Sequence, residues 1–376
     1  MNQKNILVIL PTFGDTKDSK RIKLLKISGF KINVAYFIRN QFLSREPVAD
    51  SFVQLGKVTD GKYLTRLVVY IKSIFVLRKL SKHNDLIYAI GIDLAILCFF
   101  ASIGLKNKFI IDVADIRPIQ VSNSLFGKIL RYIEIFITKR ASLIVVTSKG
   151  FIDYYYKEIL GLKSIKYFLL ENKVDYEFHN VELSRRLKND KIVLGYFGVL
   201  RDKWTLMFIN KLVETYPEKF EGIIAGINLL NTKDFSKLIS TSKQIKYLGP
   251  YKSPEDLFQL YDKIDVMLVF YPEFNSSDDW FNAKKICRSN RFYEAGYFKK
   301  PLISFSFSGD GKEIERMDIG MTLNNYDLDE AVNVVGSKLN FQNLESWKQN
   351  FYKISNNTFQ FYMENEILAK KIKEII

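Results

Sequence analysis

Two cations follow a short apolar segment in the second half of the chain. Residues Ile192–Phe197 form a candidate strand, Gly198 comes directly after it, and Arg201 and Lys203 follow. A glycine at that point lets a ligand approach the backbone closely, and a guanidinium and an ammonium group both suit phosphate oxygens. We expect these cations to stabilise the negative charge of a departing diphosphate; ordinary surface charge is the alternative.

A second group of cations precedes Glu294. Its members are Lys284, Lys285, Arg288 and Arg291. Ser289 or Asn290 could cap a helix that runs to Phe298, and a helix N-terminus with several cations is a natural phosphate site. One turn into that helix, the Glu294 carboxylate could accept hydrogen bonds from both hydroxyls of a ribose. Compensation of the helix dipole is the alternative role for Glu294.

Glycines and carboxylates also follow other candidate strands. Gly311 and Glu313 come after Leu302–Phe305, in a loop that could close over a nucleotide. In the first half, the turn after the first strand contains Gly14 and Asp15 but neither G-x-G-x-x-G nor a phosphate loop with a lysine. This turn could approach a ligand or be an ordinary tight turn.

One carboxylate of the first half is placed like a site residue. Asp115 follows the candidate strand Phe109–Val113, where it could hydrogen-bond sugar hydroxyls or another polar acceptor. A helix cap or an ion pair with Arg117 is the alternative. Together these residues predict a site for a phosphorylated ligand, with sugar recognition at other strand ends.

Strand-length apolar segments alternate with helix-length segments along the chain. Candidate strands lie near residues 6–10, 32–37, 86–90, 109–113, 143–147, 167–170, 192–197, 221–225, 245–248, 266–270, 302–305 and 320–323. Candidate helices lie near residues 18–28, 63–81, 94–104, 124–140, 149–160, 204–216, 232–241, 254–262, 290–298, 327–338, 342–353 and 358–374. Continuous Val, Ile and Leu strands separated by helices indicate parallel sheets that are covered on both faces.

The alternation predicts an α/β protein with two Rossmann-like domains facing across a cleft. It pauses at the polar segment 175–191 and then restarts. We therefore expect an N-terminal domain over residues 1–180, a second domain over 181–357 and a final helix within 358–376 that packs back on the first domain. Ligands in such sheets bind beyond the carboxyl ends of the strands.

Composition excludes several classes of protein. The chain has 376 residues and 47% apolar residues, enough for full hydrophobic cores and too many for disorder. Two Cys and two His argue against a disulfide scaffold and a zinc cluster and favour a reducing, cytoplasmic compartment. The apolar segment Leu86–Leu105 contains Asp93 and Gly91, so we expect a strand, a turn and a buried helix there rather than a membrane span.

The net charge of +15 is unevenly distributed. Residues 1–180 contain 28 Lys and Arg against 15 Asp and Glu, whereas residues 181–376 contain 28 against 26. A basic half favours an anionic partner such as nucleic acid, an anionic membrane or a phosphorylated ligand.

The motifs in this order resemble a GT-B glycosyltransferase, most closely glycosyltransferase family four. The resemblance rests on Phe197-Gly198 with Arg201 and Lys203, on Asn290–Ala295 followed by Lys300–Ile303, and on Gly309, Gly311 and Glu313. Asp85–Ile87, Ile111–Asp115 and Leu143–Ser148 match in the first half. Leu170–Asp175 resembles the family's N-G-V-D segment between the domains, with Lys173 in place of Gly.

The resemblance implies a role for each matching position. Glu294 would hold the donor ribose, with Gly198, Arg291, Gly311 and Glu313 around the donor. Arg201 and Lys203 would neutralise the diphosphate, and Asp115 would lie near the transferred sugar. Gly14 and Asp15 would contact the acceptor. Such enzymes are commonly retaining and metal-independent, so we expect a nucleotide diphosphate sugar as co-substrate and no cofactor.

One departure from the family pattern concerns its E-x7-E motif. The position eight residues before Glu294 is Ile286, so the contact of the first glutamate has no counterpart here. Recognition of the donor sugar must differ, or the basic residues 284–291 replace that contact. A degenerate, inactive homologue is also compatible with this departure.

Two basic amphipathic segments suggest a membrane partner. Residues 61–82 and 125–140 combine apolar residues at helical spacing with Lys and Arg. Such helices can lie on anionic membranes, although their apolar faces could instead only cover the sheet. A polyprenyl-diphosphate-linked glycan would suit the same surface as the acceptor.

The leading hypothesis is thus a glycosyltransferase of surface polysaccharide synthesis, peripheral on the inner face of the plasma membrane. One alternative is a nucleic-acid-binding protein, which would lack any recognisable binding motif and which we do not expect. The other is a catalytically inactive GT-B-like scaffold in a membrane complex.

Overall fold

The computed structural model describes residues 3–39, 43–59, 63–176, 191–230, 235–236, 243–271 and 287–376. It divides into two compact units, the first comprising Met1–Glu171 with Tyr362–Ile376 and the second Asn172–Phe361. Lys284, Lys285 and Ile286, most of the polar segment 175–191 and most of the helix expected at 232–241 lie outside the described residues.

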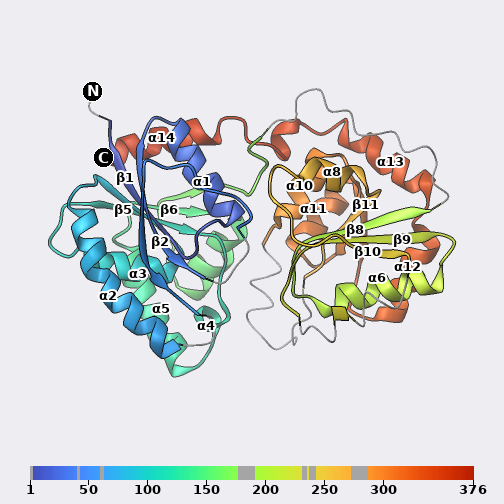
Figure 1. Cartoon of the computed structure of the whole chain (residues 1–376), viewed down its shortest axis with the longest axis horizontal. Coiled ribbons are helices and arrows are strands. Elements are labelled where there is room, and N and C mark those ends of the chain that lie inside the picture. The colour runs from blue at the N-terminus through green and yellow to red at the C-terminus, as the bar shows by residue number, and fades with distance from the viewer. Residues whose placement is uncertain are drawn as a thin grey trace. The chain divides into compact units, whose positions relative to one another are not determined.

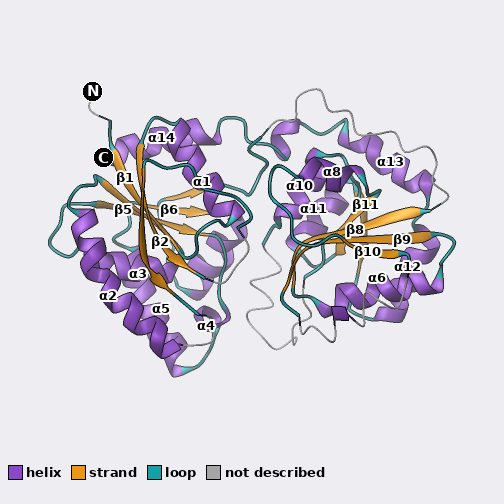
Figure 2. Ribbon diagram, in the orientation of Figure 1, coloured by secondary structure: helices purple, strands orange, loops and turns teal. Residues whose placement is uncertain are grey.

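The first unit contains a parallel sheet of seven strands in the order β3-β2-β1-β4-β5-β6-β7, and Figure 2 shows strands of this sheet between helices. Its strands are β1 (Asn5–Leu10), β2 (Lys31–Ile38), β3 (Ser51–Lys57), β4 (Leu86–Ile90), β5 (Lys108–Val113), β6 (Leu143–Val146) and β7 (Tyr167–Leu169). Chain order reverses between β1 and β4, which is where ligands bind in such sheets.

Helices cover both faces of this sheet. They are α1 (Thr16–Ile27), α2 (Tyr63–Ser81), α3 (Ile92–Ala101), α4 (Pro118–Val121), α5 (Leu125–Thr138), the π-helix η1 (Phe151–Ile159) and α14 (Glu364–Ile375). Figure 1 shows α2, α3 and α5 together on one side of the strands and α1 with α14 on the other. No helix among the described residues is long and apolar enough to cross a membrane.

A buried ion pair ties α1 to the centre of the first sheet. Arg21 on α1 is 1% exposed and donates from Nε to Asp112 Oδ2 on β5 at 3.0 Å. The hydroxyl of Tyr88 on β4 donates to the same oxygen at 2.6 Å. Losing one partner would leave a buried charge uncompensated, so these contacts fix α1 over β4 and β5.

The second unit contains a parallel sheet of six strands in the order β10-β9-β8-β11-β12-β13. Its strands are β8 (Ile192–Leu200), β9 (Phe220–Asn228), β10 (Ile245–Tyr247), β11 (Val266–Leu268), β12 (Leu302–Phe305) and β13 (Gly320–Leu323). Its helices are α6 (Lys203–Thr215), α8 (Leu257–Asp262), α10 (Asn290–Tyr297), α11 (Gly309–Met317), α12 (Leu328–Lys338), α13 (Phe341–Phe351) and the 3₁₀ helix η2 (Asn356–Thr358).

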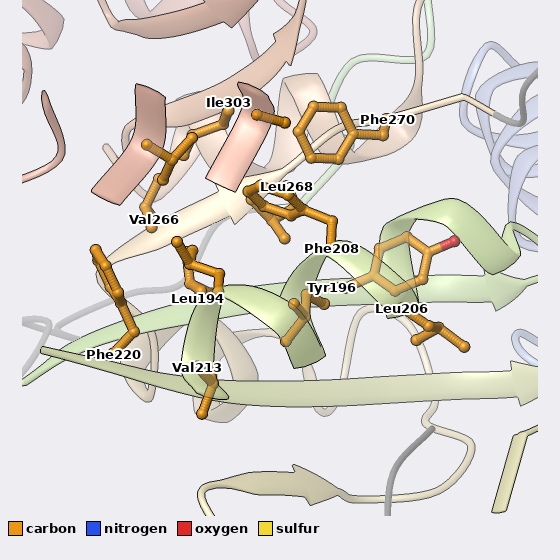
Figure 3. Close-up of a cluster of buried hydrophobic side chains, with 14 of the residues drawn as sticks. Leu194, Tyr196, Leu206, Phe208, Val213, Phe220, Val266, Leu268, Phe270 and Ile303 are labelled. Carbon is orange, nitrogen blue, oxygen red and sulfur yellow. The ribbon is translucent and has the colours of Figure 1, made fainter. Parts of the chain in front are cut away.

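The core of the second unit packs α6 against its sheet. Figure 3 shows Phe208 beside Leu268 and Phe270, with Leu194 and Tyr196 of β8 below. Trp204, at the start of α6, stacks on Phe208 at 5.4 Å between ring centroids. The first turn of α6 is therefore fixed by large aromatic side chains, and with it the preceding turn that carries Arg201.

Most predicted elements are present, with informative exceptions. The segment Leu86–Leu105 forms β4, a turn and α3, which confirms that prediction. Strand β3 was missed, and it is an edge strand that is largely exposed. The prediction of a loop at Ser308–Glu313 is wrong, because Ser308 caps α11 and both Gly311 and Glu313 lie in that helix.

The units also divide at other residues than the predicted 180 and 357. Val174 N donates to Phe359 O at 2.8 Å, and Phe361 N donates to Val174 O at 2.9 Å. These two hydrogen bonds hold residues near 174 and 360 together within the second unit. Tyr362–Ile376, including α14, groups with the first unit instead.

Two glycines face each other at the carboxyl ends of β8 and β9. Gly198 pairs with Gly226 in register, with φ of +117° and +136°. A Cβ on Gly226 would lie 1.7 Å from the carbonyl oxygen of Gly198. Only glycine allows both this backbone conformation and this approach.

Gly226→Ala is therefore expected to lower the free energy of unfolding by about 2 kcal/mol or more. Gly249→Ala is the matched control, because Gly249 also has a positive φ, of +80°, but no atom lies within 4 Å of its added Cβ. That control should cost only about 1 kcal/mol. Urea unfolding of both variants measures the difference, and equal losses would contradict the packing argument.

Candidate functional site

The two cations after β8 lie on either side of a helix cap. Arg201 and Lys203 are exposed, whereas Asp202 between them is 3% exposed and caps α6 by accepting from Trp204 N at 3.0 Å. Burial raises the pKa of Asp202 above its ordinary value, and its hydrogen bond from the Thr205 hydroxyl opposes that shift. The cap thus fixes two exposed positive charges beside the N-terminus of α6.

The N-terminus of α10 carries another set of polar groups. Ser289 is the cap, since its Oγ accepts from Phe292 N at 3.2 Å. Asn290 does not cap the helix, and its Oδ1 is buried without a hydrogen-bond partner among the described residues. A buried acceptor without a donor is unfavourable, so this oxygen is suited to a donor group on a ligand.

Arg291 connects α10 to the strand ends of the sheet. Its Nη2 donates to Phe270 O, just beyond β11, at 3.1 Å, and its guanidinium lies 5.1 Å from the ring centroid of Tyr196 on β8. Part of the predicted phosphate-binding charge is therefore used to position α10 against β8 and β11.

A buried carboxylate joins the starts of α10 and α11. Asp310 is fully buried in the first turn of α11 and accepts from Ser289 N at 3.2 Å and from the Tyr271 hydroxyl at 2.7 Å. Burial raises its pKa to about 6. Two helix N-termini, with their positive dipole ends, thus converge on one edge of the sheet.

The predicted residues of α11 make structural contacts. Gly311 lies against β12, where a Cβ would be 1.9 Å from the carbonyl oxygen of Phe305. Glu313 accepts from Arg288 Nη2 at 2.6 Å and from Arg316 Nη2 at 2.7 Å. Glu313 thereby holds Arg288 beside the start of α10.

Glu294 lies among tyrosine side chains. It is 4% exposed and accepts from the hydroxyl of Tyr261, on α8, at 3.1 Å. Burial, and after it the charge of Glu294, raises the pKa of both Tyr251 and Tyr261. Tyr261 therefore fixes the direction of the one carboxylate predicted to bind a ribose.

In the first unit, the predicted acceptor residues follow β1 and β5. Gly14 O accepts from Ser44 N and Arg45 N, both at 3.1 Å. Asp15 caps α1, accepting from Lys17 N at 2.9 Å. Asp115 is exposed, and Arg117 forms an ion pair with Asp93, in the first turn of α3.

Several residues that the sequence did not single out as site residues make contacts that order the structure. Asp310, Tyr261, Tyr271 and Gly226 order the second unit, and Asp93 orders a strand end in the first. Their only sequence signals were a helix start after Ser308 and a lone charge within an apolar segment. Over the described ranges, no cluster of three or more His, Cys, Asp or Glu could hold a metal ion.

Comparison with known proteins places this architecture. No family model matches the chain. It is similar to the succinoglycan biosynthesis protein ExoL of Rhizobium meliloti, at 22% identity over 88% of this chain and 84% of that protein. Anabaena HepE in complex with UDP and glucose matches 98% of this chain and 99% of its own with a TM-score of 0.70 at 15% identity.

A third match is sucrose-phosphate synthase of Thermosynechococcus elongatus. It covers 99% of both chains with a TM-score of 0.71 at 10% identity. This is the GT-B fold. The expected α/β class with two Rossmann-like sheets is thereby confirmed along the whole chain.

The pKa of Asp310 predicts how stability depends on pH. The folded protein binds this proton more tightly than the unfolded chain, so the contribution is fully present below about pH 4 and is lost as the pH rises through about 6. Asp310→Asn removes the titration, so its stability relative to the parent should increase by roughly 2 kcal/mol from pH 4 to 7.

Urea unfolding at several pH values measures this difference. Glu345→Gln, an exposed carboxylate on α13, is the control and should show no comparable trend. A constant difference between Asp310→Asn and the parent across the range would contradict the role of burial.

Proposed function

We propose that this chain is a glycosyltransferase of surface polysaccharide synthesis that moves a sugar from a nucleotide diphosphate sugar to a glycan. The observation that carries the proposal is the carboxyl-end edge of the second sheet: Arg201 and Lys203 follow β8, Asp310 joins the starts of α10 and α11, and Glu294 lies on α10. The similarity to ExoL and the UDP and glucose bound to HepE support the same activity.

In this proposal, different residues of the second unit bind different parts of the donor. Arg201, Lys203 and the N-terminus of α6 neutralise the diphosphate as it departs. Glu294 accepts from the ribose hydroxyls, and Tyr261 keeps its carboxylate oriented. Because the chain itself supplies these cations, the proposal requires no resident metal.

The chemistry of transfer is then mainly positioning. Positive charge develops at the sugar as the bond to the diphosphate breaks, and neutralising the diphosphate lowers the barrier. No protein nucleophile is assigned. In the first unit, Gly14 and Asp115 border the acceptor, and we propose that the anomeric configuration is retained.

Glu294→Gln is expected to weaken UDP binding about tenfold or more, because charge-assisted hydrogen bonds to the ribose hydroxyls are lost. Tyr261→Phe should have a smaller effect in the same direction, since it removes only the hydroxyl that orients the carboxylate. Isothermal titration calorimetry with UDP measures both. Glu345→Gln serves as the control, and unchanged affinity in Glu294→Gln would refute the ribose assignment.

We further propose that the acceptor is linked to a polyprenyl diphosphate and that the first unit binds the inner face of the plasma membrane. One side of this unit exposes large apolar side chains on three neighbouring helices. This apolar face consists of Leu67, Val68, Ile71 and Phe75 on α2, Phe100 on α3, and Leu125, Phe126, Ile129, Tyr132 and Phe136 on α5.

The three helices form one continuous layer. Phe99 on α3 contacts Phe136 on α5 with ring centroids 5.5 Å apart, and α3 also packs against α2 (Figure 1). Side chains such as Phe75, which is 75% exposed, and Phe126, which is 69% exposed, would leave water on reaching a bilayer. A patch of this kind indicates an interaction site rather than a sheet-covering face alone.

Charge on the same helices favours an anionic surface. The exposed cations on these helices are Lys72, Lys79 and Lys128, and Lys82, Lys139 and Arg140 directly follow α2 and α5. Helix α2 contains no Asp or Glu, and Glu134, the acidic residue of α5, is buried. Each exposed cation adds about 1 kcal/mol near an anionic membrane.

The double substitution Phe75→Asp and Phe126→Asp is expected to lower binding to vesicles of phosphatidylcholine and phosphatidylglycerol at least tenfold, because two inserted apolar groups are replaced by charges. Vesicle co-sedimentation measures the bound fraction. The control is Phe341→Asp, because Phe341 is an exposed phenylalanine on α13 of the other unit. Equal binding by the double variant and the parent would contradict the membrane proposal.

A further inference from the structure

Two arginines share one carboxylate where the apolar face meets the strand ends of the first unit. Arg117 donates from Nη1 and Nη2 to the two oxygens of Asp93, both at 3.1 Å. Arg66 donates from Nη2 to Asp93 Oδ2 at 2.8 Å. Tyr70 completes the group, accepting from Arg66 Nε at 3.0 Å and donating to Asp93 at 3.3 Å. We name these four residues the Asp93 cluster.

The cluster has surplus positive charge. Two guanidinium groups face a single carboxylate, and Arg39 adds a third that acts electrostatically on Tyr70. Asp93 also lies in the first turn of α3, whose cap is Gly91 and provides no side-chain acceptor. The potential there favours an anion even with Asp93 ionised.

Donors of both arginines remain available within this cluster. A guanidinium has five N–H donors, and neither Arg66 Nη1 nor Arg117 Nε bonds to any residue of the described chain. The side chain of Arg117 is 41% exposed and that of Arg66 is 20% exposed. Asp93 thus holds two forks in fixed directions while part of each still faces solvent.

The position of the cluster indicates which anion it suits. Its members come from the starts of α2, α3 and α4, beside the end of β4, and β4 lies between β1 and β5, which precede Gly14 and Asp115. Helix α2, which carries Arg66 and Tyr70, also carries Leu67 and Val68 of the apolar face. A ligand that joins an apolar chain to a sugar through phosphate has one group for each of these regions.

From this arrangement we infer that Arg66 and Arg117, oriented by Asp93, bind the phosphate or diphosphate group of the lipid-linked acceptor. Arginine forks match phosphate oxygens in a bidentate manner. The inference rests on the proposed function, because that function supplies an acceptor with a lipid diphosphate. It assigns the anionic link of the acceptor to the first unit, apart from the donor diphosphate at Arg201 and Lys203.

The test is binding of farnesyl diphosphate and of inorganic diphosphate to the full chain, with saturating UDP present to occupy a donor site. The parent should bind farnesyl diphosphate more tightly than inorganic diphosphate, because only the former also reaches the apolar face. Arg66→Met and Arg117→Met should each weaken farnesyl diphosphate binding about tenfold or more. Lys370→Met is the matched control and should have little effect, because Lys370 is an exposed cation of the same unit on α14, on the other side of the sheet.

Farnesyl diphosphate affinity that is unchanged in both arginine variants would overturn the inference. Equal affinity of the parent for both probes would show a site for free phosphate groups and overturn the lipid assignment. UDP affinity is measured separately on every variant. If the parent does not bind UDP, the result counts against the proposed donor site. The comparison of the arginine variants with the parent still decides the inference.

The Asp93→Asn variant keeps both arginines, so it tests the inference even if the arginine variants do not fold. It removes the competing negative charge, while the amide oxygen of the new side chain can still accept from the arginines and orient them, so farnesyl diphosphate should bind as tightly as to the parent or more tightly. Thermal melting confirms that each variant is folded. Loss of binding in a folded Asp93→Asn variant would show that binding follows the ion pair rather than the arginine charge, and would overturn the inference.

Discussion

A carboxylate that is buried where the strands of a sheet end needs hydrogen-bond donors. In each unit of this protein, the donors to such a carboxylate join helices and strands beside the sheet. Asp310 is fully buried, and its hydrogen bonds from Ser289 N and the Tyr271 hydroxyl join α10 to α11. They act together with Arg291, which contacts β8 and the segment after β11, to fix the helix start that also carries Glu294. The proposed donor site thus depends on a residue that is not expected to touch the donor.

The first unit applies the same principle with a different balance of charge. Asp93 is partly exposed and accepts from two arginines, so the group around it remains positive. Asp112, by contrast, is fully buried with Arg21 and Tyr88 and serves to hold α1. Burial and the number of partners therefore separate a structural ion pair from a group that is suited to bind an anion.

Much of this fold could be predicted from the sequence, because continuous apolar strands and intervening helices have distinct patterns. The strand-end positions of Gly198, Arg201 and Asp115 follow from that pattern alone. Edge strand β3 could not be predicted, since it is mostly exposed and lacks the apolar signal. Helix α11 was mistaken for a loop because two glycines near its start concealed a helix capped by Ser308.

The side-chain partners could not be predicted in the same way. Arg117 lies two residues from Asp115 in sequence, yet it pairs with Asp93 at the start of a different helix. Glu313, which the sequence predicts to border the nucleotide, accepts from Arg288 and Arg316. Such pairings depend on which strand ends are neighbours in the sheet, and that order is a property of the fold rather than of local sequence.

Mass spectrometry of a glycan acceptor after incubation with a UDP-sugar shows directly whether this chain transfers a sugar. The full chain, a panel of UDP-sugars and a polyprenyl-diphosphate-linked glycan are the reactants. We expect the acceptor to gain the mass of one sugar residue and UDP to be released in equal amount. Release of UDP with an unchanged acceptor, or no consumption of any UDP-sugar in the panel, would contradict it.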